Sequence, residues 1–183
     1  MNFADQPKET RYASSAEIIK QRLYESRPSV VCWKVDILNK KGQKTKAVKD
    51  SIAGGICSHD NRWYVFINKN KVSRAAIVWI LNKGYIQKGY EIDHIDRNSL
   101  NDCIGNLRLV TSSQNKMNRG RHKNNKVGIK GVSWSNSRKK YEARIQKNGK
   151  QIFVGYFNDI SEAETAIKAT RKMFHGNYAC HGD

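Results

Sequence analysis

The residues with the clearest capacity for chemistry lie between Glu91 and Asn115, in the stretch EIDHIDRNSLNDCIGNLRLVTSSQN. An adjacent acid and imidazole, Asp93 and His94, are followed by two asparagines, Asn106 and Asn115. A histidine can take a proton from water near neutral pH, and a side-chain carbonyl can hold its other ring nitrogen in the protonated form. Oxygen ligands without a thiolate favour magnesium or manganese over zinc. These residue types predict a general base, an orienting group and a pair of metal ligands.

The elements around this stretch can position those side chains. YEIDHID reads as a short strand and DRNS as a turn. NLRLV alternates apolar and polar residues, which predicts a second strand with Leu107 and Leu109 pointing inward and Arg108 pointing outward. Thr111 and Gln114 have the spacing of a capping box. They predict a helix whose first turn carries the second asparagine.

The segment IDHIDRNSLNDCIGNLRLVTSSQNKMNR resembles the HNH nuclease motif of the ββα-metal class. It is most similar to the phage and intron-encoded homing endonucleases, in which the final histidine of the motif is an asparagine. The resemblance extends upstream through GGICSHDNRWYVFINKNKVSRAAIVW. It implies these roles by position: His94 is the general base, Asn106 orients it, Asp93 and Asn115 bind magnesium or manganese, and Asn118 and Arg119 contact phosphate.

The sequence departs from that family pattern at three places. The family often has D-N-R where this chain has Asn101, Asp102 and Cys103. It often has glycine at the position of Arg97, and a histidine before the arginine at the position of Ser73. None of these is a predicted catalytic position, so the departures concern the grip on the substrate more than the reaction.

Composition indicates the partner. The 183 residues carry 34 Lys and Arg against 16 Asp and Glu, a net charge of +18. A charge of this size repels itself unless a polyanion neutralises it, and double-stranded DNA is the predicted partner. The longest apolar run, AAIVWIL, is far shorter than the roughly 20 residues that span a bilayer, which argues against a membrane partner. The N-terminus lacks the apolar segment of a signal peptide, which predicts a cytoplasmic protein of the bacterial host cell, if the gene is phage-encoded.

The N-terminal part reads as scaffold. A helix is predicted from about Ser15 to Glu25, with Ser14 and Glu17 at capping-box spacing. VVCWKVDIL and RWYVFIN are typical of strands. SRAAIVWILNKG predicts a buried helix that ends at Gly84. The four cysteines have no C-x-x-C spacing and are expected to be reduced thiols.

The C-terminal part has a different pattern. Residues 119–126, RGRHKNNK, have no hydrophobic period and predict a basic linker. IKGVSWS, KYEARIQK and QIFVGYF predict three short strands, the last two joined at Asn148 and Gly149, a strong hairpin signal. SEAETAIKATRKMFHG predicts a covering helix with a capping box at Ser161 and Glu164, ending at Gly176. A three-stranded antiparallel sheet packed on one helix is expected.

The two faces of that sheet can be separated by alternation. Ala143 and Ile145 are expected to face the helix, and Arg144 and Gln146 to face outward. An outward aromatic residue, Phe153, among polar residues of a basic protein favours a face that reads DNA. A β-ribbon fits the major groove.

The segment GIKGVSWSNSRKKYEARIQKNGKQIFVGYFNDISEAETAIKA resembles the Apetala-type DNA-binding domain of plant ethylene-response factors and many phage endonucleases. In that family the sheet enters the major groove. The plant domains are richer in Arg and Trp here, so their sequence preference does not transfer. The positions that match its DNA contacts are Lys130, Ser133, Arg144, Gln146, Gln151 and Phe153.

These observations predict an α+β protein with an HNH nuclease domain at residues 1–118, its ββα-metal core at about 90–118, a linker at 119–126 and the Apetala-type domain at 127–183. The predicted function is a metal-dependent, site-selective DNA endonuclease that leaves 5′-phosphate and 3′-hydroxyl ends. A monomer, the expected state, would nick one strand, and a break in both strands would need a second chain, as in a dimer on DNA, or a second binding event. The alternatives are a non-catalytic DNA-binding regulator with a decayed nuclease domain and, less favoured, an RNA-binding protein, for which paired stacking aromatics are missing from the sequence.

Overall fold

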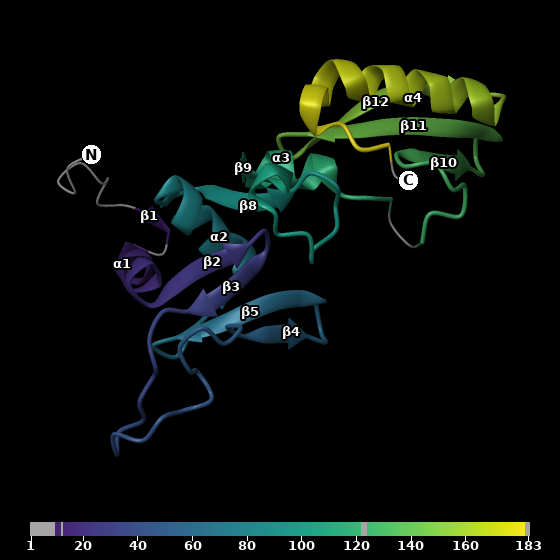
Figure 1. Ribbon diagram of the computed structural model, residues 1–183. Coiled ribbons are helices and arrows are strands. Elements are labelled where there is room, and N and C mark those ends of the chain that lie inside the picture. Colours follow the sequence, from purple (N-terminus) through teal and green to yellow (C-terminus); the bar gives the residue numbers. More distant parts are fainter. Residues whose placement is uncertain (1–9, 12, 122–123, 182–183) are drawn as a thin grey trace. The chain divides into compact units, whose positions relative to one another are not determined.

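The chain forms two compact units in the computed structural model, which describes residues 10, 11, 13–121 and 124–181 (Figure 1). The first unit is Met1–Leu109 and the second is Val110–Asp183. Each unit has a hydrophobic core of its own. The sequence had placed the domain boundary after residue 118, whereas the helix α3 (Ser112–Asn118) belongs to the second unit.

The first unit combines two helices with small antiparallel sheets. Strand β1 pairs with β7, β2 with β3, and β8 with β9, while β4, β5 and β6 form a three-stranded meander. Strand β9 contains the boundary between the units. The elements are β1 (Thr10–Arg11), α1 (Ala13–Arg22), β2 (Leu23–Arg27), β3 (Val30–Trp33), β4 (Gly55–Cys57), β5 (Arg62–Ile67), β6 (Asn70–Ser73), α2 (Arg74–Lys83), β7 (Ile86–Gln87), β8 (Tyr90–His94), the 3₁₀ turn η2 (Ile104–Asn106) and β9 (Leu107–Thr111).

Helix α2 supplies much of the core of this unit. Its start is capped by Ser73, whose hydroxyl accepts the N–H of Ala76 at 3.3 Å. It ends at Gly84, which has a φ of 94°, a value that glycine adopts without strain. Ile77 and Ile80 are fully buried. The prediction of a buried helix that ends at this glycine is therefore confirmed.

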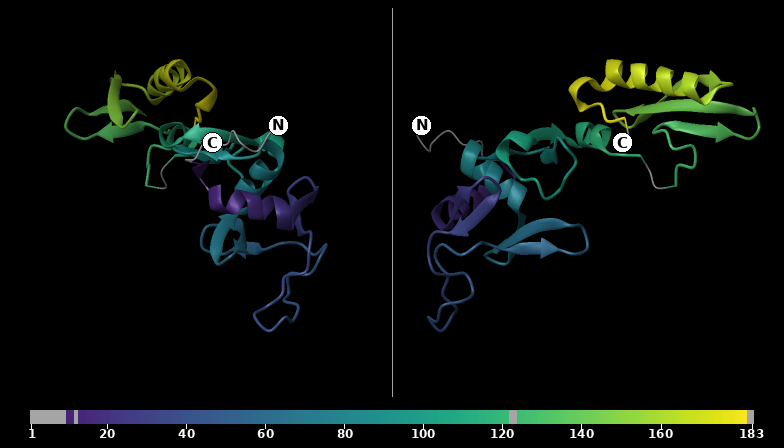
Figure 2. Two further views of the ribbon diagram at one scale, coloured as in Figure 1. Left: turned by 90° about the vertical axis from the view of Figure 1, so that its left-hand side faces the viewer. Right: turned by 45° about the vertical axis from the view of Figure 1, so that its right-hand side comes forward.

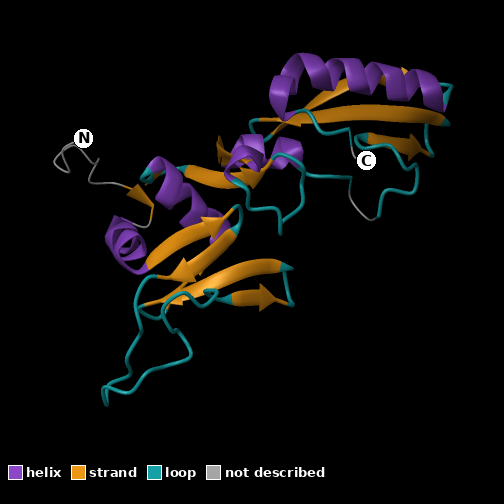
Figure 3. Cartoon of the chain, in the orientation of Figure 1, coloured by secondary structure: helices purple, strands orange, loops and turns teal. Residues whose placement is uncertain are grey.

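Helix α1 and strand β3 differ from the prediction. The helix was expected to run to Glu25, but it ends at Arg22 because Leu23 begins β2, where it is fully buried and pairs with Trp33. The helix begins at Ala13, two residues before the predicted start at about Ser15. Strand β3 stops at Trp33, and the chain from there to β4 is almost entirely loop (Figure 3). Pairing with neighbouring strands, which a local pattern does not contain, set both limits.

The second unit is a three-stranded antiparallel sheet with one long helix over it. Strand order is β10–β11–β12, and α4 lies along the sheet in both views of Figure 2. Val132 and Ala143 of the sheet and Ile167 of the helix are buried together. The remaining elements are β10 (Val132–Ser135), β11 (Lys140–Lys147), β12 (Lys150–Phe157), α4 (Ile160–His175) and the 3₁₀ turn η3 (Gly176–Tyr178).

Local turn chemistry in this unit agrees with the sequence at the hairpin and differs at the helix start. Asn148 and Gly149 have φ values of 49° and 78°, as a tight two-residue hairpin requires. Helix α4 begins earlier than expected, with Asp159 as its cap, and the Asp159 carboxylate accepts the N–H groups of Ser161 and Glu162. The predicted cap at Ser161 is therefore wrong. None of the helices within the described ranges has the length and hydrophobicity of a membrane-spanning segment.

Candidate functional site

The predicted base lies at the end of β8, where the chain leaves a short ladder with β9. The side chains of Asp93 and His94 are both buried, although they are neighbours in one strand. The N–H of Ile95 donates to the carbonyl of Asn106 at 2.9 Å, and the N–H of Arg97 donates to the carbonyl of His94 at 3.0 Å. Arg97 has a φ of 67°, which explains why glycine suits this position in similar sequences. These bonds close the loop beside the histidine.

Asp96 braces the loop between residues 95 and 106 from within. Its Oδ1 accepts the N–H of Asn98 at 2.8 Å and Nδ2 of Asn106 at 2.9 Å, and its Oδ2 accepts Nδ2 of Asn101 at 2.7 Å. Oδ1 of Asn106 in turn accepts the N–H of Asp96 at 3.1 Å. Burial alone would raise the pKa of Asp96, but these hydrogen bonds to its carboxylate outweigh burial and lower the pKa. The loop is thus held by an ionised carboxylate.

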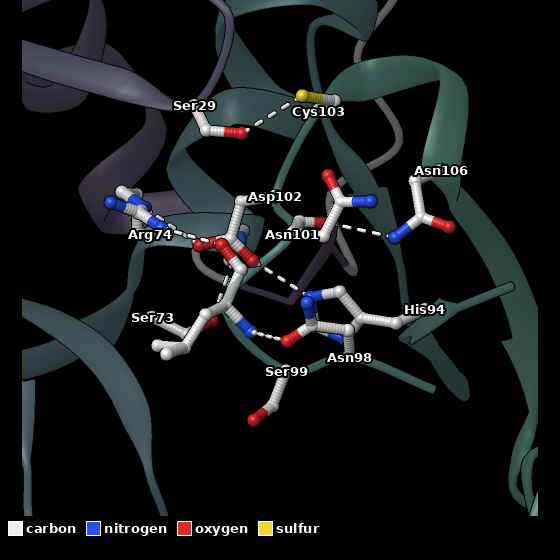
Figure 4. Close-up of polar contacts among 12 residues, drawn as sticks. Ser29, Ser73, Arg74, His94, Asn98, Ser99, Asn101, Asp102, Cys103 and Asn106 are labelled. Carbon is white, nitrogen blue, oxygen red and sulfur yellow. Dashed lines mark hydrogen bonds and ion pairs between the residues drawn. The ribbon is translucent and has the colours of Figure 1, made fainter. Parts of the chain in front are cut away.

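His94 and Asn106, the predicted base and its predicted orienting residue, contact other residues in the structure. Nδ2 of Asn106 donates to Asp96 and, at 2.8 Å, to the carbonyl of Asn101. Nε2 of His94 lies 2.7 Å from Oδ1 of Asp102 (Figure 4). The sequence had assigned the orienting contact to Asn106, and the structure brings a carboxylate to the ring instead.

Asp102 is the centre of a buried chain of contacts. It is 1% exposed, and its Oδ2 accepts Nε of Arg74 at 2.7 Å. The guanidinium of Arg74 also donates to the carbonyl of Leu100 at 2.9 Å and lies 4.7 Å from the ring of Trp63. Sequence reasoning missed both charged residues. Two features of the sequence could have indicated them: residues 101–103 depart from the family pattern, and an arginine follows Ser73.

Arg108 corrects another prediction. It was expected to point outward from β9, but its Nε and a terminal nitrogen lie 2.9 and 2.8 Å from Oδ2 of Asp93. Both groups are largely shielded from solvent, with 18% and 8% of their side chains exposed. The guanidinium therefore fixes the orientation of the carboxylate beside His94, because two donors meet one oxygen.

The ligand chemistry available here fits a hard divalent cation. Magnesium binds through one or two carboxylates and completes its shell with water and substrate phosphate. Asp93, in the first unit, offers a carboxylate oxygen of this kind. Within the described ranges, no three or more His, Cys, Asp or Glu side chains gather as a metal cluster, and the four cysteines are free thiols. An oxygen donor of this kind suits a hard divalent cation better than zinc.

The remaining motif residues lie on or directly after α3, in the second unit. The hydroxyl of Thr111 accepts the N–H of Gln114 at 3.3 Å, and Oε1 of Gln114 accepts the N–H of Thr111 at 2.8 Å. This confirms the predicted capping box. Asn115 follows directly within the helix, Asn118 is buried at its last turn, and Arg119 is exposed after it.

The outer face of the β10–β12 sheet carries most of the side chains predicted to contact DNA. Arg144 lies opposite Phe153, and Gln146 lies opposite Gln151. Phe153 is 52% exposed, and Arg144 donates to Oε1 of Gln151 at 3.2 Å and also pairs with Glu142. We call this set the outer face: Ser133, Arg144, Gln146, Gln151 and Phe153, all of which are exposed.

Lys130 differs from the other predicted DNA contacts. Its ammonium donates to three backbone carbonyls, those of Met117 at 2.9 Å, Arg119 at 2.6 Å and Cys180 at 3.2 Å. An ammonium has three donors, so these bonds engage each of them. Lys130 ties the end of α3 and the C-terminal segment to the start of the sheet.

Comparison with known proteins places this site in a recognised motif. A model of the HNH endonuclease family matches residues 76–117. Protein 3.8 of Escherichia phage T7 is 41% identical over 102 residues, which cover 56% of this chain and 84% of that protein. A protein of Acanthamoeba polyphaga mimivirus named as an uncharacterized HNH endonuclease is 38% identical over 73 residues, 40% of this chain and 36% of that protein.

The matched segment contains the site just described. Asp93, His94, Asp102, Asn106 and Asn115 all fall between residues 76 and 117. No solved structure matches the chain. The Apetala-type resemblance of the second unit remains a prediction from sequence.

Proposed function

We propose that this chain, which contains an HNH endonuclease domain at residues 76–117, is a metal-dependent DNA endonuclease of the homing type. Cleavage is expected to leave 5′-phosphate and 3′-hydroxyl ends. The observation that carries the proposal is a buried histidine, His94, fixed at a strand end by a carboxylate and placed next to Asp93 within the HNH motif. The mimivirus relative, which is named as an uncharacterized HNH endonuclease, supports it.

His94 acts in this proposal as the general base. Its imidazole takes a proton from the water that attacks the scissile phosphorus. The loop braced by Asp96 and Asn106 keeps the ring at the end of β8, so we assign Asn106 an indirect part in positioning the base through the loop. Positioning of this kind matters because small displacements of a catalytic group cost large factors in rate.

Asp93 and Asn115 are the proposed ligands of a divalent cation, magnesium or manganese. Nucleases of this family generally use such a metal. When bound, the cation stabilises negative charge on the phosphate and on the departing 3′ oxygen. Arg108 holds one oxygen of the Asp93 carboxylate in place. The assignment of Asn115 rests on its position in the sequence motif.

We propose that double-stranded DNA is held by the outer face and by phosphate contacts from Arg119 and Asn118. The net charge of +18 supports strong attraction to the duplex. The exposed Phe153, flanked by Arg144 and Gln151, offers apolar and polar contacts to base edges. Lys130 is left out of this set because its ammonium serves the fold.

One base per chain implies that a single copy nicks one strand. A break in both strands then requires a second copy or a second binding event. The phage relative supports action in the cytoplasm of a bacterial host.

The proposal is tested by nicking of supercoiled plasmid. We expect the full chain to convert plasmid to open circles with magnesium, and chelation of the metal to stop the reaction. His94→Ala should lower the single-turnover rate by about 10²–10⁴-fold, the usual contribution of a general base. DNA affinity, measured by anisotropy, should be nearly unchanged. Binding without any cutting by the unaltered chain would instead support the non-catalytic regulator.

A further inference from the structure

We propose that Asp102 is a positioning residue for His94, and that Arg74 holds Asp102 in place. The carboxylate keeps the ring proton on Nε2 and so leaves the basic lone pair on Nδ1. This assignment rests on the proposed function, in which His94 takes the proton from water. Asp102 touches the base and is not itself expected to touch the substrate.

The geometry gives each carboxylate oxygen one charged or polar partner. Oδ1 lies 2.7 Å from Nε2 of His94, and Oδ2 lies 2.7 Å from Nε of Arg74. Asp102 is 1% exposed and His94 is 7% exposed, so water competes little for these bonds. The second bond of Arg74, to the carbonyl of Leu100 at 2.9 Å, fixes the guanidinium to the same loop. Figure 4 shows the three side chains in a row.

This arrangement specifies the tautomer of the ring. A neutral imidazole carries one N–H, and a carboxylate can only accept. The nitrogen that faces Asp102 must therefore carry the hydrogen, and the lone pair that can accept a proton is on Nδ1. Without the carboxylate, the Nε2 side of the ring no longer selects a tautomer, and only the Nε2–H tautomer has its lone pair on Nδ1.

Because of Arg74, an asparagine at position 102 cannot keep His94 in the tautomer that Asp102 selects. A guanidinium donates and never accepts. In Asp102→Asn, the only remaining oxygen must face Arg74, because an amide NH₂ facing a guanidinium would set donor against donor. The amide NH₂ then faces Nε2, which must accept, and the ring proton moves to Nδ1. In Ser-His-Asp hydrolases the corresponding Asp-to-Asn change keeps the geometry and lowers kcat about 10⁴-fold through the wrong tautomer.

A purely structural role predicts something different. The ion pair between Arg74 and Asp102 would stabilise the loop whatever the state of the histidine ring. Loss of Asp102 would then lower thermal stability and would leave the ring tautomer of His94 where it was. The tautomer therefore separates the two roles.

The experiment uses the full chain with ¹⁵N-labelled histidine. Long-range ¹H–¹⁵N correlation spectra should show His94 as the Nε2–H tautomer in the unaltered chain and as the Nδ1–H tautomer in Asp102→Asn. With saturating plasmid and magnesium, the single-turnover rate of the variant should fall by about 10²–10⁴-fold, within the range for loss of an acid–base group. Its DNA dissociation constant should be unchanged.

Asp50→Asn is the matched control. It removes the same charge in the same unit, at an exposed position whose φ of 64° asparagine tolerates well. The hydroxyl of Tyr24, which donates to the Asp50 carboxylate at 2.8 Å, can still donate to an amide oxygen. Both the rate and the His94 tautomer should remain as in the unaltered chain.

Three results would overturn the assignment. An Nδ1–H tautomer in the unaltered chain would do so even if the variant did not fold. An unchanged tautomer in a folded Asp102→Asn would show a structural role only. A wild-type rate for that variant would also exclude positioning. If the unaltered chain leaves plasmid intact, the proposed nuclease function fails, and the tautomer measurement still decides whether Asp102 orients the ring.

Discussion

The first unit buries and pairs the polar residues of its candidate site, whereas the second unit displays its own on an open sheet. Asp102 is 1% exposed and has a partner on each oxygen, while Phe153 is 52% exposed on the outer face. Burial strengthens electrostatic interactions and fixes geometry, which a catalytic group needs. Long side chains on an open face can change conformation when a partner binds. The two units therefore differ in how far their polar side chains are held in place before any partner binds.

The difference extends to what a substitution would do. In the first unit, a changed polar residue leaves a buried partner unsatisfied, which costs more than the lost bond itself. On the outer face, water can take over the contacts of a side chain that is removed. The same type of substitution is therefore expected to affect catalysis in one unit and affinity in the other.

The largest expected effect is a loss of stability from substitutions in the two hydrophobic cores, and each loss should be confined to one unit. Ile77 in the first unit and Ile167 in the second are both fully buried, in separate clusters. Truncation of either to alanine should cost about 2–5 kcal/mol of stability. We expect Ile167→Ala to raise hydrogen exchange in α4 and β10–β12, and Ile77→Ala to raise it around α2. Equal exchange increases in both units for both variants would mean that the chain unfolds as one body.

The next effect separates two roles for Asn106. If it braces the loop through Asp96, Asn106→Asp should be worse than Asn106→Ala, because it sets one carboxylate against another where a 2.9 Å bond existed. If it orients His94 directly, as the sequence predicts, Asn106→Asp should be the milder change, because aspartate can still accept the ring N–H. A hydrogen bond to a charged group contributes about 1.5–3 kcal/mol. Single-turnover cleavage rates of the two variants give the order.

Much of the fold followed from local signals in the sequence. Ser73 and Gly84 bound α2, Asn148 and Gly149 make the hairpin, and Thr111 caps α3, all through contacts within a few residues. The end of α1 could not be predicted in this way. Leu23 continues a helical pattern, yet it joins β2 because pairing with β3 buries it fully.

The candidate site divides in the same manner. The placement of Asp93 and His94 at a strand end followed from the pattern of YEIDHID. The contact between Arg74 and Asp102 joins residues 28 positions apart, and the partner of Arg108 lies across a ladder. Such contacts depend on how elements pack, and periodicity does not encode them. They nevertheless decide which group holds the imidazole.

The smallest expected effect is on DNA binding by the outer face. A charge change on the other side of the same unit serves as the control. Arg144→Ala removes a side chain of the outer face, and Lys172→Ala removes an exposed cation of α4, the helix that covers the opposite side of the sheet. If Arg144 contacts a base edge, its loss should cost about 1–3 kcal/mol of preference for the cleaved site over random duplex. If it contacts phosphate, the slope of log affinity against log salt should fall by about 0.9, and affinity should drop equally for all sequences. Lys172→Ala should change neither quantity appreciably, because it faces away from the duplex in this arrangement. Anisotropy titrations over about 50–200 mM salt, on both duplexes, distinguish these outcomes.

The cleavage rate at saturating DNA should stay at the wild-type value in both variants, since neither touches the histidine. Equal losses for Arg144→Ala and Lys172→Ala would indicate that total charge, and not the outer face, governs binding, and the contrast between a buried reacting centre and an open reading surface would have to be abandoned.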